Sequence, residues 1–102
     1  MMTKRQQYIY QLIGKITNLE QKKIYSKNKP EYYGQLYYKL AILTPEQRIK
    51  DLYVFANLLN NQQIWPKIEQ AECLNKPYLF FYQRGRMNAI LLVDWKELEH
   101  EN

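Results

Sequence analysis

Lysine and tyrosine side chains alternate along residues 20–32 and are the groups best suited to hold a ligand. The segment contains four lysines and two interleaved tyrosines: Lys22, Lys23, Lys27, Lys29, Tyr25 and Tyr32. An ammonium group attracts phosphate, and an exposed phenol ring stacks on a planar base. The whole chain has ten Tyr, two Trp and three Phe in 102 residues. One small core needs fewer rings, so we expect some of them to face outward.

The positive charge is concentrated in one half of the chain. Residues 1–50 hold ten Lys or Arg against three Glu, a net charge of +7, whereas residues 51–102 hold five against seven, a net charge of −2. A basic half on a small domain favours an anionic partner, of which nucleic acid is the commonest. The Lys, Asn, Ile and Tyr usage is also typical of an AT-rich coding sequence. A merely solvated basic surface therefore stays an alternative.

Groups that could carry catalysis are few. The single histidine, His100, lies in a charged tail, and Cys73 lies on the apolar side of a predicted helix with no histidine near it in sequence. Glu69 and Glu72 are three residues apart, which a solvated helix face explains without a metal. The three glycines form no phosphate-binding loop, because they are scattered at Gly14, Gly34 and Gly85. We expect a binding module rather than an enzyme, with no catalytic residues, metal ligands or cofactor.

The length and composition predict one domain. With 46% hydrophobic and 25% charged positions, the 102 residues can form one core, so we expect a single domain over residues 1–102 with an ordered core at about 8–98. The single cysteine excludes an internal disulfide and fits a reducing intracellular compartment, a bacterial cytoplasm or an organelle interior. The apolar run 89–93 is too short to cross a membrane, and residues 1–7 lack a signal-peptide pattern.

The elements that must position the cations and rings are mostly strands. Alternation with period 2 predicts strands over residues 8–19, 34–43 and 50–58, with Gly14 permitting a bulge or a sharp bend in the first. Between the first two strands we expect a long basic hairpin loop, residues 20–32, or strand extensions at its base. In the second and third strands, the expected inward residues are Leu36, Tyr38, Leu40, Ile42, Leu52, Val54 and Ala56. The expected outward residues are Gln35, Tyr37, Lys39, Ala41, Tyr53, Phe55 and Asn57.

The second half of the chain predicts one helix and two more strands. Apolar residues recur at helical spacing over residues 64–74, with Pro66 in the first turn and Asn75 as the stop, which indicates a helix of two to three turns. Strands follow at residues 78–82 and 89–95, joined by a polar turn at residues 83–88. We expect Trp65 and Trp95 to lie in the core or at a subunit contact.

Three strands, a helix and two strands match the order of an OB fold, a five-stranded Greek-key barrel that is all-β with one short helix between its third and fourth strands. The segments Val54–Leu58 and Asn75–Arg86 strengthen the match, since they resemble a layout in bacterial-type single-stranded DNA-binding proteins. The chain lacks the long acidic or Gly-rich C-terminal tail of many full-size members. In that respect it looks closer to the primosomal PriB family of single-OB-domain dimers.

The resemblance implies a binding surface on the second and third strands, flanked by the one–two and four–five loops. The strands would present Tyr37, Lys39, Tyr53 and Phe55. The loops would add Lys22, Lys23, Tyr25, Lys27 and Lys29 from one side and Arg84 and Arg86 from the other. The implied function is binding of single-stranded DNA with little sequence preference, in replication, recombination or repair. DNA is favoured over RNA through the resemblance alone, and the implied assembly is a homo-oligomer, a dimer or tetramer, with Tyr8 and Tyr10 at the interface.

Each part of this interpretation has a structural alternative. Tyr53 and Phe55 could pack beneath the helix or against a neighbouring subunit, the lysine-rich loop could be only solvated, and Arg84 and Arg86 could simply flank a tight turn. A register error of one residue would exchange all inward and outward positions. Two other functions stay open: a protein–protein adaptor in a larger assembly, and a small RNA-binding protein of the translation machinery.

Overall fold

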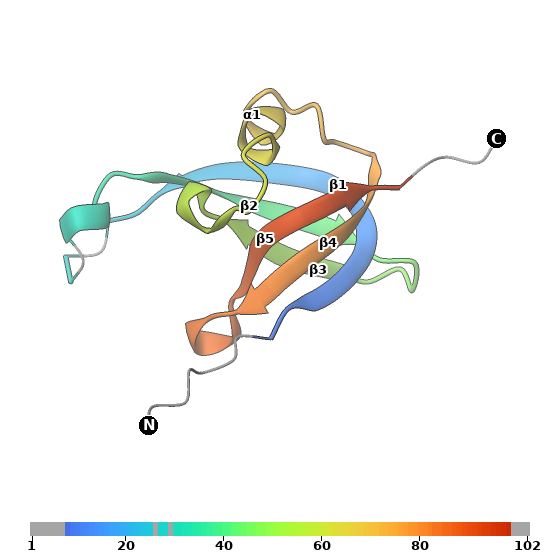
Figure 1. Ribbon diagram of the computed structural model, residues 1–102, viewed down its shortest axis with the longest axis horizontal. Coiled ribbons are helices and arrows are strands. Elements are labelled where there is room, and N and C mark those ends of the chain that lie inside the picture. The colour runs from blue at the N-terminus through green and yellow to red at the C-terminus, as the bar shows by residue number, and fades with distance from the viewer. Residues whose placement is uncertain (1–7, 26, 29, 99–102) are drawn as a thin grey trace.

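Five strands form a closed barrel in the computed structural model, which describes residues 8–25, 27–28 and 30–98 (Figure 1). The strands are β1 (Tyr10–Lys23), β2 (Leu36–Leu43), β3 (Ile49–Val54), β4 (Pro77–Arg84) and β5 (Ile90–Glu97). The helix α1 (Ile64–Glu69) lies between β3 and β4, short 3₁₀ turns occur at η1 (Pro30–Tyr32) and η2 (Ala56–Leu58), and a tight turn, η3 (Arg86–Asn88), joins β4 to β5. No helix of the described part of the chain has the length and apolar character needed to span a bilayer. Lys29 and His100 lie outside the described residues.

The strand order β1-β2-β3-β5-β4 is that of an OB fold, so the predicted fold is confirmed. β1 pairs with both β2 and β4, and the neighbouring pairs are antiparallel except at one place. There β3 and β5 run parallel, and within the described residues Tyr53 of β3 pairs with Leu91 of β5. The barrel therefore closes through a short parallel seam between β3 and β5.

β1 bends around the barrel because it must serve two partners (Figure 1). Its first half pairs with β4 and its second half with β2. At Gly14 the neighbouring strand approaches so closely that a Cβ would lie 2.5 Å from Ile42 Cγ2 and 2.7 Å from the Leu43 carbonyl oxygen. The bulge itself falls between Ile16 and Asn18 and not at Gly14. Gly14 thus allows β1 and β2 to pack closely where β1 bends. The bulge that was also considered for Gly14 lies two residues further along the strand.

The core lies inside the barrel and confirms most of the predicted inward positions of β2 and β3, whereas Leu36, at the start of β2, is only half-buried. Tyr38, Leu40, Ile42, Leu52 and Val54 are buried, with partners from the other strands and from α1. Fully buried contributors from those elements are Ile16, Ile64, Ile68, Phe80 and Leu92.

The two tryptophans belong to this packing. The Trp95 ring stacks on Tyr78 at 4.2 Å between centroids, and the half-buried Trp65 ring meets the edge of Tyr38 at 5.1 Å. Both contacts agree with the expected place of the tryptophans in the core.

One predicted strand boundary was confirmed and another was wrong. β1 continues to Lys23, which agrees with the expected strand extensions at the base of the hairpin and places Lys22 and Lys23 in the strand. β3 ends at Val54, and Ala56 is exposed in η2 instead of facing the core.

The helix ends early, at Glu69, because the chain enters the left-handed region at Ala71, where φ is 56°. Glu72, Cys73 and Leu74 therefore lie outside α1, and Leu74 instead forms a parallel bridge with Ile16. Asn75, the expected stop, also has a positive φ, 63°, and its N–H donates to the Ile16 carbonyl at 2.8 Å. The segment between α1 and β4 thus pairs with β1 through Ile16.

Candidate nucleic-acid interface

Three aromatic rings form a row on the outer side of β2 and β3. Tyr37 belongs to β2, Tyr53 to β3, and Phe55 follows β3 directly. The Tyr37 and Phe55 rings stack at 5.0 Å between centroids with 16° between their planes, and Tyr37 lies 6.4 Å from Tyr53. All three residues are half-buried, because they alternate with the core positions Tyr38, Leu52 and Val54. The aromatic row defined by Tyr37, Tyr53 and Phe55 thus presents ring surface to solvent outside the core.

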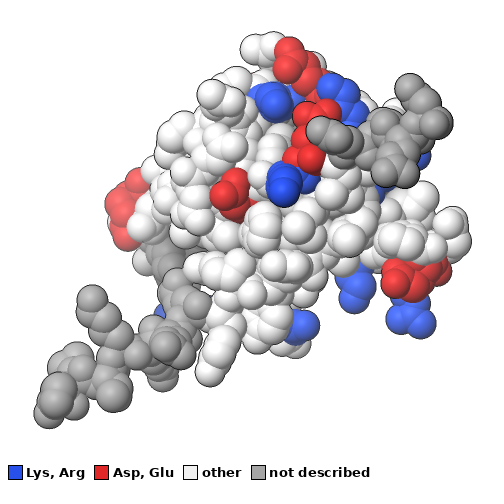
Figure 2. Space-filling model, turned by 45° about the vertical axis from the view of Figure 1, so that its right-hand side comes forward, with Lys and Arg blue, Asp and Glu red and all other residues white. Residues whose placement is uncertain are grey.

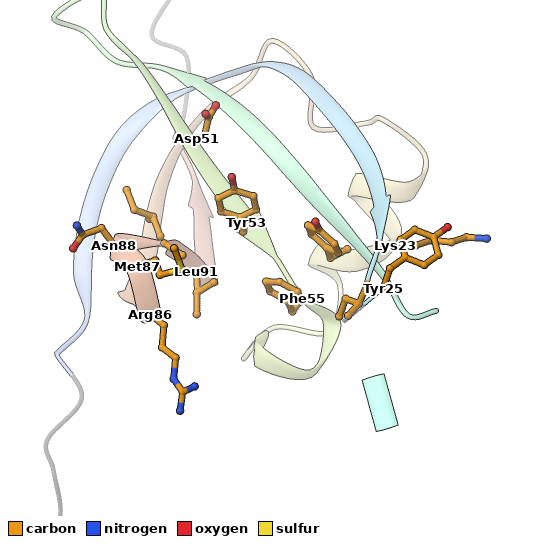
Figure 3. A pocket seen from close by; sticks show the side chains of 13 residues that line it. Lys23, Tyr25, Asp51, Tyr53, Phe55, Arg86, Met87, Asn88 and Leu91 are labelled. Atoms are coloured by element: carbon orange, nitrogen blue, oxygen red, sulfur yellow. The ribbon is translucent and has the colours of Figure 1, made fainter. Parts of the chain in front are cut away.

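The aromatic row is the floor of an open groove with a volume of about 730 Å³. Figure 3 shows Tyr53 and Phe55 between two flanks, with Lys23 and Tyr25 on one side and η3 residues on the other. The full lining is Lys23, Ile24, Tyr25, Tyr37, Asp51, Tyr53, Phe55 and the segment Arg86–Leu91. Segments far apart in sequence therefore meet around one row of rings.

The β1–β2 connection holds Tyr25 at the edge of this groove. The Ile24 N–H donates to the Gln35 carbonyl at 3.0 Å, and the Gly34 N–H donates to the Ile24 carbonyl at 2.7 Å. Gly34 has a φ of 85°, a conformation that favours glycine. The Tyr25 ring packs edge-on against Tyr33 at 5.6 Å and stays 64% exposed. Tyr25 is thus fixed from one side and open to a ligand on the other.

The predicted cations do not all reach the groove. Lys23 and Arg86 line it and are exposed. Lys22 Nζ lies 3.4 Å from Glu20 Oε2, and Lys39 Nζ lies 3.8 Å from Asp51 Oδ2. Lys27 is exposed in the connection but is not among the lining residues.

Arg84 also lies apart from the groove lining. It is the last residue of β4 and not part of the four–five loop. Its guanidinium carbon is 5.4 Å from the centre of the Tyr10 ring, which in turn stacks on Tyr82 at 5.5 Å. Arg84 therefore makes a cation–π contact at the start of β1, where the sequence analysis expected a subunit contact for Tyr10.

The distribution of charged side chains does not by itself identify a binding surface. On the face shown in Figure 2, basic and acidic side chains lie side by side near the top, above a broad uncharged area. Folding therefore brings basic residues and acidic residues together on this face, although the net charges of the two halves of the sequence differ in sign. The rings, more than the net charge, distinguish the groove.

Seven lining residues were not predicted from the sequence: Ile24, Asp51, Met87, Asn88, Ala89, Ile90 and Leu91. A signal was available for Asp51, because it is two residues before Tyr53 and so shares its side of β3. Met87 and Asn88 fell within the predicted polar turn, but only the three-dimensional closure of the hairpin brings that turn beside the aromatic row.

The thiol and two nearby carboxylates of the described chain differ in their exposure to solvent. Cys73 is fully buried, and burial raises the pKa of its thiol to about 11. Glu69 and Glu72 are both exposed. In the described parts of the chain, no three His, Cys, Asp or Glu side chains are close enough to hold a metal ion together.

The fold and the groove place the chain in the OB class of barrels. No protein-family model and no curated protein sequence matches it. Among solved structures, it is similar to the mitochondrial single-stranded DNA-binding protein Rim1 from S. cerevisiae, with a TM-score of 0.64 and 12% sequence identity. The match covers 94% of this chain and 99% of that chain. At this identity, the likeness shows a shared fold.

Proposed function

We propose that this protein binds single-stranded DNA with little sequence preference. The observation that carries the proposal is the aromatic row in an open groove, flanked by Lys23 and Tyr25 on one side and Arg86 on the other. The similar fold of Rim1, a mitochondrial single-stranded DNA-binding protein, supports DNA as the ligand. Holding strands open in replication, recombination or repair is the role that such binding serves.

The groove would bind a strand by stacking and by charge. Unpaired bases stack on Tyr37, Tyr53 and Phe55, each contributing about 1–3 kcal/mol by alanine substitution. Lys23 and Arg86 neutralise phosphates on the two sides of the row, with Lys22 and Lys27 adding to the field of the β1–β2 side. Ring faces accept any base, so sequence preference is weak. Duplex DNA keeps its bases stacked inward and cannot use the row.

Self-association belongs to the same proposal. One OB domain covers only about 4–16 nucleotides, so a second copy lengthens the binding path. Tyr8, Ile9 and Ile13 are 69%, 48% and 49% exposed at and before the start of β1, an apolar surface suited to a second copy. Light scattering after size exclusion measures the assembly, and Ile13→Glu should shift it towards the monomer. A monomeric wild-type protein would remove this part of the proposal.

Fluorescence anisotropy of a labelled oligo(dT) of roughly 30 nucleotides tests the function, since that length exceeds one OB site. Wild-type protein should bind tightly at about 50 mM salt and markedly more weakly at about 200 mM salt. The double variant Tyr53→Ala, Phe55→Ala should lose about 30-fold or more in affinity. Ile49→Ala is the matched control, because Ile49 is 58% exposed at the other end of β3 and does not line the groove.

Three outcomes separate the alternatives. Binding that survives the double variant would keep the function and move the site. Equal or tighter binding of oligo(rU) would favour RNA and the translation machinery. Absence of binding at low salt would overturn the proposal and leave the protein–protein adaptor, for which exposed tyrosines are partner contacts.

A further inference from the structure

The β4–β5 hairpin ends in a turn that is unfavourable for one of its residues. The Ala89 N–H donates to the Arg86 carbonyl at 3.2 Å, and the Gly85 N–H donates to the Ala89 carbonyl at 2.8 Å. Between them, Met87 has φ 58° and ψ 34°, and Asn88 has φ 60°. Two consecutive left-handed residues are the signature of a type I′ turn, which favours Asn, Asp and Gly. Asn88 suits this turn, whereas Met87 does not.

The rest of the fold does not bury the side chain of Met87. It is 98% exposed, the highest value among the exposed large hydrophobic residues. The other non-glycine residues with positive φ in the described chain are Gln47, Ala71, Asn75 and Asn88, which are polar or small. Met87 is thus the one large apolar side chain among the described residues that is held in a left-handed conformation.

The position of Met87 suggests a use for an exposed apolar group. Met87 lines the groove, on the flank opposite Lys23 and Tyr25 (Figure 3). Its neighbours Arg86 and Asn88 offer a cation and an amide at the same edge. A thioether chain is flexible and polarisable and packs well on the face or edge of a flat ring.

We propose that Met87 is a base-contacting residue that packs against the bases of a bound strand from the η3 side of the groove. The inference rests on the proposed single-stranded DNA binding and adds an apolar contact to it. Bases stacked on Tyr53 would be covered by the Met87 side chain, while Arg86 beside it faces phosphate. The unfavourable turn aims this side chain outward at the groove edge.

Met87→Asn tests the proposal, because it removes the apolar side chain and relieves the turn at once. The variant should raise the Tm by about 2–5 °C, since Asn adopts the left-handed conformation readily. The same variant should weaken oligo(dT) binding by about five- to tenfold, through loss of the apolar contact. A purely structural role for Met87 does not combine a gain in Tm with a loss in affinity.

Two control variants separate the side chain from the turn. Met87→Leu keeps an apolar side chain in the same turn and should bind within about twofold of wild type. Gln47→Gly relaxes a left-handed residue in the β2–β3 turn, outside the groove lining, keeps Met87, and should leave affinity unchanged. Wild-type affinity in Met87→Asn, or an equal loss in Met87→Leu, would overturn the inference and leave the proposed function standing. Failure of the wild-type protein to bind oligo(dT) would instead overturn the proposed function itself.

Discussion

A carboxylate stands in the groove beside the rings. Asp51 lines the groove, and its Oδ2 lies 3.8 Å from Lys39 Nζ, so the two charges offset each other across β2 and β3. Both side chains are partly exposed, which makes the pair worth little to stability. For an anionic ligand the pair matters more, because Asp51 repels phosphate and occupies Lys39.

Asp51→Asn should therefore strengthen binding of single-stranded DNA. Removing the negative charge leaves the Lys39 ammonium free to attract phosphate, and we expect affinity to rise about two- to fivefold at low salt. Anisotropy titrations measure the change. Glu69→Gln removes the same charge from the exposed side of α1, outside the groove lining, and should leave affinity nearly unchanged. Weaker binding by Asp51→Asn would show that the carboxylate holds the ligand instead of repelling it.

The rings of the site could be predicted from the sequence more readily than its charges. Alternation along β2 and β3 suffices to place Tyr37, Tyr53 and Phe55 opposite the core, because a strand has a fixed period of two. Ion pairing of Lys39 depends on which residue of the next strand lies nearby, and the sequence pattern does not specify that register. Met87 escaped prediction because its role depends on a turn that its own residue type disfavours.

At the scale of elements, the bend of β1 depends on one missing side chain. β1 can pair with both β4 and β2 only because Gly14 lets Ile42 and the Leu43 carbonyl approach. A glycine within a strand is typical of close backbone approach, and here the neighbour includes backbone that cannot rotate away.

Gly14→Ala should destabilise the fold by about 1–3 kcal/mol, because its new Cβ would overlap a buried neighbour. Urea unfolding measures the loss. Gly34→Ala is the informative comparison: it has no atom within 4 Å of the added Cβ, but its φ of 85° is unfavourable for alanine. We expect a smaller loss of about 1 kcal/mol there. Equal stability of Gly14→Ala and wild type would contradict the close approach of β1 and β2.

Element ends were harder to predict than element types. The apolar spacing through Cys73 and Leu74 looked helical, yet Cys73 is buried and Leu74 half-buried because the chain turns back to join Ile16. Burial by a helix face and burial by a bridge to a strand leave similar spacing in a short segment. The strand alternation was more dependable, since it extended over longer segments with one face in the core.

For the whole molecule, the charge around the groove should determine how the proposed binding of single-stranded DNA responds to salt. For single strands, each phosphate contact contributes about −0.7 to the slope of log affinity against log salt. Lys23→Gln and Arg86→Gln should each make that slope shallower by about 0.7. Lys96→Gln, on an exposed part of β5 outside the groove lining, should not change it. Equal slopes in all three variants would place the phosphate path elsewhere.

Stability should fall in alkaline solution. Burial raises the pKa of Cys73 from 9.0 to about 11 and that of Tyr78 from 10.0 to about 12. Above pH 9 the unfolded chain releases these protons first, while the folded protein retains them, so the unfolded state gains. The free energy of unfolding should drop by up to about 1.4 kcal/mol per pH unit for each group, over pH 9–11 for the thiol and pH 10–12 for the phenol.

Denaturant unfolding at several pH values measures this slope. Cys73→Ala should remove the part that begins near pH 9, and Tyr78→Phe the part that begins near pH 10. An unchanged slope in both variants would assign the alkaline loss to other groups.

The barrel should open locally most easily at the short parallel seam between β3 and β5. Its recorded pair, Tyr53 with Leu91, joins two residues that both line the groove, whereas the β1 contacts on the far side of the barrel are long antiparallel ladders. Amide hydrogens of β3 and β5 that face this seam should therefore exchange with solvent deuterium sooner than those within the β1 ladders. A strand lying across the groove would bridge both edges of the seam and slow that exchange. A bound strand would then stabilise the closed barrel, and its release would restore the faster opening of the seam.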